Sequence, residues 1–271
     1  MSTFRPVALV TGASSGIGAE LARIFAANGH EVVMVARNEP QLTLIADDIG
    51  RAGFARPHVI PVDLSRLDAG ARLGHELASR ALDPAYVVNN AGFGLVGLVD
   101  QLDRSEQLAM VDVNVRALTD LSLRWIGSLV AHKGGILNVA SVAGFLPSPG
   151  MAVYYASKAY VVSFTEALHQ ELKPRGVRVT VLCPGPVPTP FHERAGAKPR
   201  PFARVFQQST EKVARAGYNG LMAGQRLVVP GLANKGVLLI ARLLPRATML
   251  KAADSRKRRR EPPGPRWPRQ R

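Results

Sequence analysis

A glycine-rich turn between a short apolar run and a helical pattern constrains the fold of this chain more than any other feature. Residues 6–10 are apolar throughout, as in a strand buried on both faces. Residues 11–18 read Thr-Gly-Ala-Ser-Ser-Gly-Ile-Gly, a helical pattern follows over 19–28 up to Gly29, and a second apolar run covers 31–36. Small residues let the backbone approach an anion, and a helix N-terminus attracts one. This order of elements predicts a dinucleotide phosphate site.

The end of the second predicted strand indicates which dinucleotide binds. NAD sites place a carboxylate there for the ribose 2′-hydroxyl, whereas a 2′-phosphate favours arginine. This chain has Ala36 followed by Arg37. We therefore expect NADP(H) to be preferred, although NAD(H) stays open because Arg37 could also be a solvated loop residue.

Apolar runs and helical patterns alternate along the chain. We expect helices at 41–53, 67–81, 105–130 (capped by Ser105) and from about Tyr154 through Lys173, with strands at 58–62, 85–88, 136–140 and 177–182. A helix at 209–223 and a last strand at 226–229 follow. The alternation predicts an α/β fold: one doubly wound, Rossmann-like, mostly parallel sheet of about seven strands with helices on both faces.

Residues suited to binding follow several of these strands. Gly12, Arg37, Asp63, Asn90, Ser141 and Gly185 all fall at strand carboxyl ends. Ligands of doubly wound sheets collect at that edge. We therefore expect one composite site there.

Tyr154 and Lys158 stand four residues apart on the predicted helix, hence one turn from each other. A nearby ammonium stabilises a phenolate, so Lys158 should lower the pKa of Tyr154 and make it a usable acid. Ser141, thirteen residues upstream of Tyr154, could bind the oxygen that Tyr154 protonates. Taken alone, a tyrosine and a lysine at this spacing are more often structural.

Composition and charge exclude several other classes of protein. No apolar stretch is long enough for a membrane span, and the N-terminus lacks a secretory pattern. Cys183 is the only cysteine, which excludes an internal disulfide and favours a reducing, cytoplasmic location. The six histidines lack ligand spacing, so no metal is expected. Residues 1–190 carry 16 Lys/Arg and 16 Asp/Glu, whereas 191–271 carry 19 and 4, so the net charge of +15 belongs to the C-terminal third.

These motifs together resemble the short-chain dehydrogenase/reductase superfamily over residues 5–190. The matching motifs are T-G-x-x-x-G-x-G at 11–18, N-N-A-G at 89–92, Y-x-x-x-K at 154–158 and P-G at 184–185, with Asn114 and Ser141 at the family's catalytic Asn and Ser positions. The resemblance implies that Tyr154 is the general acid or base and that Ser141 polarises the substrate carbonyl. It also implies that Lys158 binds the nicotinamide ribose and that Asn114 holds a relay water.

The resemblance further implies a set of cofactor contacts. Ser15 and Ile17 would approach the ribose and phosphates, Asp63 and Leu64 the adenine, Asn90 the adjoining ribose, and Val187 the carboxamide. The full set is Gly12, Ser14, Ser15, Gly16, Ile17, Gly18, Arg37, Asp63, Leu64, Asn90, Gly92, Tyr154, Lys158, Pro184, Gly185, Val187 and Thr189, with Ser141 and Tyr154 also binding substrate. For single residues plainer interpretations stay open. Asn114 could bond to nearby backbone, Ser141 could cap a turn, and Asp63 could merely end a strand.

The C-terminal third is less regular. Residues 1–255 would form one catalytic domain in which 191–225 cover the substrate. Six residues could line an apolar pocket or simply pack in the core: Phe93, Leu95, Leu146, Met151, Phe191 and Phe202. The amphipathic segment 234–253 is expected to pack on the body or on a second subunit, with weak contact to an acidic membrane as the alternative. Residues 256–271 would be a disordered basic tail without a specific nucleic-acid target.

The sequence therefore predicts an NADP(H)-dependent oxidoreductase that interconverts a carbonyl and an alcohol. A hydrophobic ketone-, lipid- or steroid-like substrate and a homo-oligomer (dimer or tetramer) are expected. The main alternative is a catalytically retired dinucleotide-binding module acting on a membrane or nucleic acid through its basic tail. A third interpretation keeps the same four residues for epimerisation or dehydration.

Overall fold

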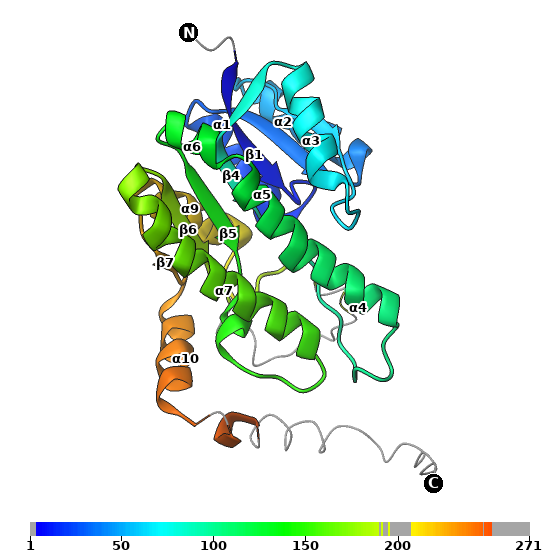
Figure 1. Ribbon diagram of the computed structural model, residues 1–271, viewed down its shortest axis with the longest axis vertical. Helices are drawn as coiled ribbons and strands as arrows, with labels where there is room; N and C mark the ends of the chain where they lie inside the picture. The colour runs from blue at the N-terminus through cyan, green and yellow to red at the C-terminus, as the bar shows by residue number, and fades with distance from the viewer. Residues whose placement is uncertain (1–3, 190, 192–194, 196–206, 246, 251–271) are drawn as a thin grey trace.

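A single parallel sheet of seven strands organises the chain (Figure 1). The computed structural model describes residues 4–189, 191, 195, 207–245 and 247–250. The strands are β1 (Arg5–Thr11), β2 (Glu31–Ala36), β3 (His58–Pro61), β4 (Leu82–Asn89), β5 (Gly135–Val139), β6 (Arg178–Leu182) and β7 (Leu227–Val228). Their order is β3-β2-β1-β4-β5-β6-β7. The predicted doubly wound sheet of about seven strands is confirmed.

Helices cover both faces of the sheet. They are α1 (Gly16–Ala27), α2 (Glu39–Arg51), α3 (Ala69–Ser79), α4 (Arg104–Val111), α5 (Leu118–Arg124), α6 (Ile126–Ala131), α7 (Ala152–Leu172), α9 (Thr210–Met222) and α10 (Leu232–Leu243). One core layer joins side chains of α1, α2 and α9 to the sheet, and the other joins those of α3, α5, α6 and α7. Both faces are therefore buried, which explains the unbroken apolar runs in the central strands.

The strand order reverses its direction beside β1. β1 pairs in parallel with β2 on one side and with β4 on the other. The chain therefore winds outward through β2 and β3 and then crosses back to β4. In open α/β sheets, ligands bind at the carboxyl ends of the strands at such a switch point. This topology puts the loops after β1, β2, β4, β5 and β6 at one edge.

The long helix expected over 105–130 is interrupted. α4 runs into a π-helical segment, η1 (Asp112–Ala117), which is followed by α5, and Trp125 leaves helical geometry before α6 begins. The helix cap is Asp103 and not Ser105, since the Asp103 carboxylate accepts from the Glu106 N–H at 2.9 Å. A carboxylate near a helix N-terminus also complements its dipole, which favours Asp103 over the hydroxyl.

The C-terminal elements differ modestly from expectation. α9 (expected over 209–223) is capped by Ser209, while α10 begins at Leu232 and ends at Leu243, ahead of Pro245. The segment expected over 234–253 is broken at Pro245 and is helical again at 247–250, and its last residues, 251–253, lie outside the described residues. Among the residues described, no helix combines the length and apolarity that crossing a bilayer demands. Phe202 and the predicted tail at 256–271 lie outside the described residues.

Candidate active site

The turn after β1 is held by close packing at three glycines. Gly12 and Gly16 have φ of +64° and +55°, in the left-handed region that favours glycine. A methyl group on Gly12 would lie 2.8 Å from the Ala91 Cα, and one on Gly18 would lie 2.3 Å from the Gly12 carbonyl oxygen. The turn therefore needs glycine for conformation at Gly12 and Gly16, and for space at all three positions.

The N-terminus of α1 suits an anionic group. Ser15 is its N-cap, yet the Ser15 side chain makes no capping hydrogen bond, and the first turn carries no acidic residue. The first N–H groups of a helix have no partner within it, and the helix dipole favours negative charge there. The residues present thus fit a dinucleotide pyrophosphate, as the glycine spacing predicts.

Thr11 and Asn90 tie this turn to the end of β4. The Thr11 hydroxyl accepts from the N–H groups of Asn90 and Ala91, each at 3.1 Å, and donates to the Val88 carbonyl. The Asn90 amide donates to the Thr11 and Gly12 carbonyls at 3.0 and 3.2 Å. The side-chain N–H groups of Asn90 therefore stabilise the conformation of the turn. The positioning role of Thr11 was not predicted, although it opens the matching motif.

Arg37 and Asp63 lie near each other beyond β2 and β3. Arg37 is exposed, and Asp63 accepts from the N–H and the hydroxyl of Ser65 at 3.0 and 2.8 Å. Burial alone would raise the pKa of Asp63, but those hydrogen bonds and the charges of Arg37 and Arg66 outweigh it and hold the pKa below its usual value. This edge therefore pairs one carboxylate with a cation that remains accessible to a ligand.

Tyr154 lies near the start of α7, and its hydroxyl lies near that of Ser141 after β5. Burial raises the pKa of Tyr154 to about 12, and the polar interaction with the Ser141 hydroxyl opposes this rise only in part. The net shift of this pKa is therefore upward, opposite to the direction predicted from the Tyr154–Lys158 spacing. The Lys158 Nζ lies 6.0 Å from the centre of the Tyr154 ring, and the loss of water around the phenolate dominates.

Lys158 is buried one turn further along α7. Its Nζ donates to the Val139 carbonyl at the end of β5, at 2.8 Å. Burial lowers the pKa of Lys158 to about 8, an effect that the nearby Cys183 thiol partly opposes. A methyl group on Gly92 would lie 3.4 Å from Nζ, so the loop after β4 passes directly against the ammonium. At neutral pH the ammonium is still protonated.

Asn114 occupies the π-helical segment η1 and is fully buried. Its amide donates to the Phe93 carbonyl at 2.9 Å and to the Ser157 hydroxyl at 3.0 Å, and its oxygen accepts from the Phe93 N–H at 3.1 Å. The Ser157 hydroxyl in turn donates to the Tyr154 carbonyl at 2.7 Å. Asn114 thus links the loop after β4 to the first turn of α7. Such π-helical segments often occur at functional sites.

The loop after β6 closes the other side. The Pro184 carbonyl accepts from the Val142 N–H at 3.0 Å and from the Ser141 hydroxyl at 3.4 Å. A methyl group on Gly16 would lie 2.9 Å from Thr189 Cγ2, and one on Gly185 would lie 2.4 Å from the Asn234 Oδ1 of α10. This loop therefore contacts Ser141, the glycine turn and α10.

Two of the predicted cofactor residues are core residues by their side chains. Leu64 and Val187 are both buried within the two main core layers, and Ile17 packs against one of them. Only their main chains remain for a ligand. We therefore expect these residues to contact the dinucleotide through their backbone atoms.

A network of buried amides beneath the site was missed by the sequence analysis. The Asn89 amide donates to the Ser122 hydroxyl and to the Asn138 oxygen, each at 2.9 Å, and Asn138 donates to the Thr165 hydroxyl at 3.0 Å. These bonds join β4, α5, β5 and α7. The network could have been found from Asn89 and Asn138, which stand at the end of or within apolar runs expected to be buried strands, because a buried amide needs hydrogen-bond partners.

An apolar cluster surrounds the Tyr154 ring. It contains Phe93, Met110 and Ala143, with Leu95, Met151 and Phe191 packed against it. The Phe191 ring lies 5.4 Å from the Tyr154 ring, centre to centre. Of the six residues expected to line an apolar pocket, four therefore gather around Tyr154, Leu146 does not belong to this cluster, and Phe202 lies outside the described residues. Within the described residues, no group of three His, Cys, Asp or Glu side chains is placed to hold a metal ion.

Taken together, two parts meet at one edge of the sheet. The glycine turn and helix N-terminus can bind phosphates, and beside them Ser141, Asn114 and the α7 pair Tyr154 and Lys158 converge from three different segments. Two neighbouring hydroxyls next to a buried ammonium can bind a carbonyl oxygen and transfer a proton to it.

Comparisons with known proteins agree with this arrangement. Residues 6–200 match the family model described as short chain dehydrogenase. A sulfoacetaldehyde reductase of Chromohalobacter salexigens is 35% identical over 188 residues, covering 68% of this chain and 74% of the relative.

Two solved structures are similar along most of the chain. A short-chain dehydrogenase from Sphingobium yanoikuyae in complex with NADPH is 31% identical with a TM-score of 0.76, covering 88% of this chain and 94% of that one. A bulky-bulky ketone specific alcohol dehydrogenase from Comamonas testosteroni is 28% identical with a TM-score of 0.72, covering 90% and 97%.

Proposed function

Because this chain belongs to the short chain dehydrogenase family, and is thus an oxidoreductase of carbonyl and alcohol groups, we propose that it uses NADP(H) with Tyr154 as proton donor and acts on a hydrophobic carbonyl compound. The observation that carries the proposal is that the Ser141 hydroxyl lies near enough to the buried Tyr154 hydroxyl to lower its pKa, beside the buried Lys158 ammonium. These groups lie at the same sheet edge as the glycine turn.

The protein's part in the reaction follows from these groups. Ser141 and Tyr154 hydrogen-bond the substrate carbonyl oxygen and so orient and polarise it. As negative charge develops on that oxygen, the Tyr154 hydroxyl donates its proton. An alkoxide is a stronger base than a phenolate, so a phenol with a pKa of about 12 remains a competent donor. The bound dinucleotide supplies the hydride.

Lys158 contributes charge and position. Its ammonium, fixed by the Val139 carbonyl, stabilises the phenolate left after proton transfer. Asn114 holds the loop after β4 and the first turn of α7 in register through Phe93 and Ser157. We propose that these two residues keep the proton donor and the cofactor ribose in fixed relation.

Arg37 supports the choice of NADP(H). It is exposed at the end of β2, where a carboxylate would accept from a ribose 2′-hydroxyl, and Asp63, whose pKa the Arg37 charge helps to lower, is already hydrogen-bonded to Ser65. A guanidinium free to form two parallel hydrogen bonds suits a 2′-phosphate. NADPH in the related Sphingobium yanoikuyae structure agrees with this proposal. NAD(H) remains an acceptable second cofactor.

The apolar surroundings of Tyr154 support a hydrophobic substrate. Phe93, Met110 and Met151 offer no charge to pair with a charged substrate group near the catalytic hydroxyls. The bulky ketone specificity named for the Comamonas testosteroni enzyme fits the same class. The alternative of a retired module finds no support, because the catalytic residue types are all present and the relatives are named reductases and dehydrogenases.

The test is an assay of the purified chain with NADPH against a panel of apolar ketones, apolar aldehydes and charged carbonyl compounds, following NADPH absorbance. We expect turnover of apolar ketones or aldehydes, and a loss of kcat by roughly 10²–10⁴-fold in Tyr154→Phe. NADPH binding, measured by calorimetry, should be nearly unchanged in that variant.

Tyr160→Phe is the matched control. Tyr160 lies on the same helix, and its exposed ring bears a hydroxyl bonded to Thr119 rather than to Ser141. It should retain activity. If both variants keep wild-type kcat, or if only charged carbonyl compounds are reduced, the proposal is wrong.

A further inference from the structure

α10 buries one side and exposes the other. Leu238 and Asn234 are buried against the body, with 6% and 2% of their surfaces exposed. Leu232, Leu239 and Ile240 are 85%, 61% and 57% exposed. The sequence expectation that this helix packs on the body is therefore correct for one side only.

The exposed residues of α10 form one surface. Residues separated by three, four or seven positions share a helix face, and positions 232, 239 and 240 fall within a narrow arc. Lys235, also exposed, lies between Leu232 and Leu239 at the border of this arc. We call Leu232, Lys235, Leu239 and Ile240 the α10 outer face. Leu244 and Leu250, beyond the helix, are exposed as well.

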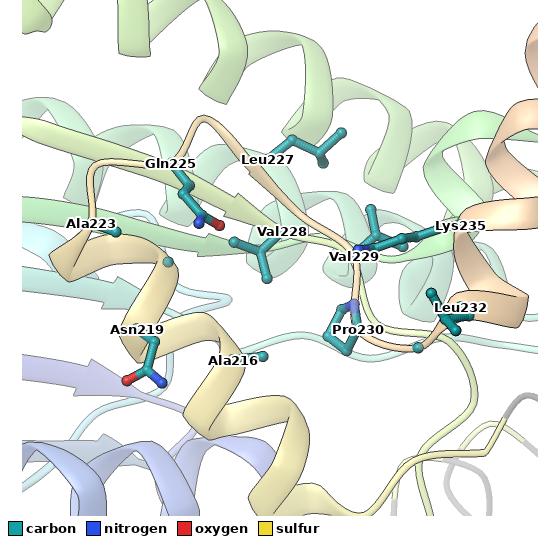
Figure 2. Close-up of a pocket in the computed structure, with 12 residues that line it drawn as sticks. Ala216, Asn219, Ala223, Gln225, Leu227, Val228, Val229, Pro230, Leu232 and Lys235 are labelled. Atoms are coloured by element: carbon teal, nitrogen blue, oxygen red, sulfur yellow. The ribbon is translucent and has the colours of Figure 1, made fainter.

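A pocket of about 520 Å³ adjoins this face (Figure 2). It lies between α9 and the segment that leads from β7 into α10, and Val228, Val229 and Pro230 form its apolar side. Leu232 and Lys235 line the pocket as well as belonging to the outer face. The accessible apolar surface therefore continues from the helix into the pocket, and no catalytic residue lines it.

The charge of the chain beyond β7 indicates what could cover this surface. Residues 232–271 contain twelve Lys/Arg and two Asp/Glu. A second copy of the chain would bring two such segments together, and like charges oppose that association. An anionic lipid surface attracts them instead, by about 1 kcal/mol for each basic residue near it.

We propose that the α10 outer face binds the surface of an anionic phospholipid membrane. A helix of twelve residues is too short to cross a bilayer, so it would lie in the interface with its leucines among the acyl chains and its cations at the headgroups. α10 follows the carboxyl end of β7 and its Asn234 packs against Gly185, so the attachment lies at the active-site edge of the sheet (Figure 1).

The experiment is co-sedimentation of the full chain with phosphatidylcholine vesicles, with and without phosphatidylserine, at low and high salt. We expect binding to the vesicles that contain phosphatidylserine, weakened by salt. Leu239→Asp should lower the partition coefficient about tenfold or more, because a leucine that would enter the acyl chains is replaced by a charge that anionic lipid repels. Vesicle binding needs no turnover, so this result is independent of the proposed activity.

Leu44→Asp is the matched control, since Leu44 is 58% exposed on α2, on another part of the surface. It should bind vesicles as the wild type does. Failure to bind anionic vesicles, or equal loss in both variants, overturns the proposal. Sedimentation equilibrium without lipid provides a second test. If the wild type and Leu44→Asp dimerise while Leu239→Asp is monomeric, the α10 outer face is a subunit interface and the proposal is overturned.

Discussion

The two halves of the site are built from different materials. At the ends of β1 and β2 the phosphate half consists of backbone, glycines and the exposed Arg37. At the end of β5 and the start of α7 the catalytic half consists of buried side chains, with Tyr154 and Lys158 both removed from water. The first half binds through shape and helix polarity, and the second through groups whose proton affinities are shifted by burial.

This difference has an energetic consequence. The close-packed glycine turn serves folding and binding together, because the same contacts define both. A buried ammonium, in contrast, lowers the stability of the folded state, since burial disfavours its charge. Substitutions that remove the charge in the catalytic half should therefore raise the stability of the folded protein while they abolish activity. Substitutions in the glycine turn should lower both the folding stability and the affinity for the dinucleotide.

The largest effect should come from Lys158→Met, which keeps the side-chain length and removes the charge. We expect kcat to fall by about 100-fold or more, since the phenolate loses its stabilising cation. The melting temperature should rise, because at neutral pH the depressed pKa of Lys158 costs about 3 kcal/mol of folding free energy.

The sign follows from proton binding. Between pH 8 and 10.5 the unfolded chain holds the Lys158 proton and the folded chain does not, so wild-type stability should rise with pH there. In Lys158→Met this contribution should vanish, and calorimetry across that range measures it. Lys173→Met, at an exposed lysine beyond α7, is the control. A lower melting temperature in Lys158→Met would contradict the comparison.

The second effect concerns the glycine turn. Gly12→Ala places a methyl group 2.8 Å from the Ala91 Cα at a φ of +64°, and backbone cannot move aside cheaply. We expect a loss of about 3 kcal/mol in unfolding free energy, together with weaker NADPH binding. Denaturant unfolding and calorimetry measure the two.

Gly29→Ala separates the steric cost from the conformational one. Gly29 also has a positive φ, +80°, but a methyl group there would meet nothing within 4 Å. It should lose only about 1 kcal/mol and bind NADPH normally. Equal losses in the two variants would mean that the packing against Ala91 contributes little.

The sequence revealed the phosphate half better than the catalytic half, for a physical reason. The glycine turn is local: its strand, turn and helix are consecutive, so the pattern alone predicts the geometry. The raised pKa of Tyr154 depends on burial by Phe93, Met110 and Phe191, which come from distant parts of the chain. The Tyr154–Lys158 spacing correctly predicted that both residues lie on one helix, one turn apart, but it predicted the wrong direction for the shift of the Tyr154 pKa.

Long-range contacts also explain the other errors. The π-helical segment at Asn114 allows its amide to reach Phe93 and Ser157, and no pattern within 105–130 signals that need. The choice of Asp103 over Ser105 as cap, in contrast, was readable, because a carboxylate three residues before Glu106 is an equally good cap signal. Local helix and cap propensities can thus be read from the sequence, whereas the burial of a side chain and its hydrogen-bond partners cannot.

A third effect, on pH dependence, tests the catalytic half directly. Reduction needs the Tyr154 phenol, which stays protonated well below its pKa of about 12, so its rate should be flat up to about pH 8 and fall as Lys158 deprotonates. Alcohol oxidation needs the phenolate, so its rate should rise by about tenfold per pH unit from pH 6 to 8. Parallel profiles in the two directions would show that another group carries the proton.

The smallest effect should come from Arg37→Ala, which tests the one charged contact of the phosphate half. Removing a guanidinium from a 2′-phosphate should weaken 2′,5′-ADP binding by about tenfold, or about 1.4 kcal/mol, and leave 5′-AMP binding unchanged. Calorimetry with the two nucleotides measures this without turnover. Arg51→Ala, an exposed arginine at the end of α2, is the control. Because Arg37 also lowers the pKa of Asp63, that pKa should move upward in Arg37→Ala, which NMR titration can follow.

If the binding of both nucleotides were weakened equally, Arg37 would act through Asp63 and the shape of the loop. The phosphate half would then resemble the catalytic half, because its function would depend on linked side chains.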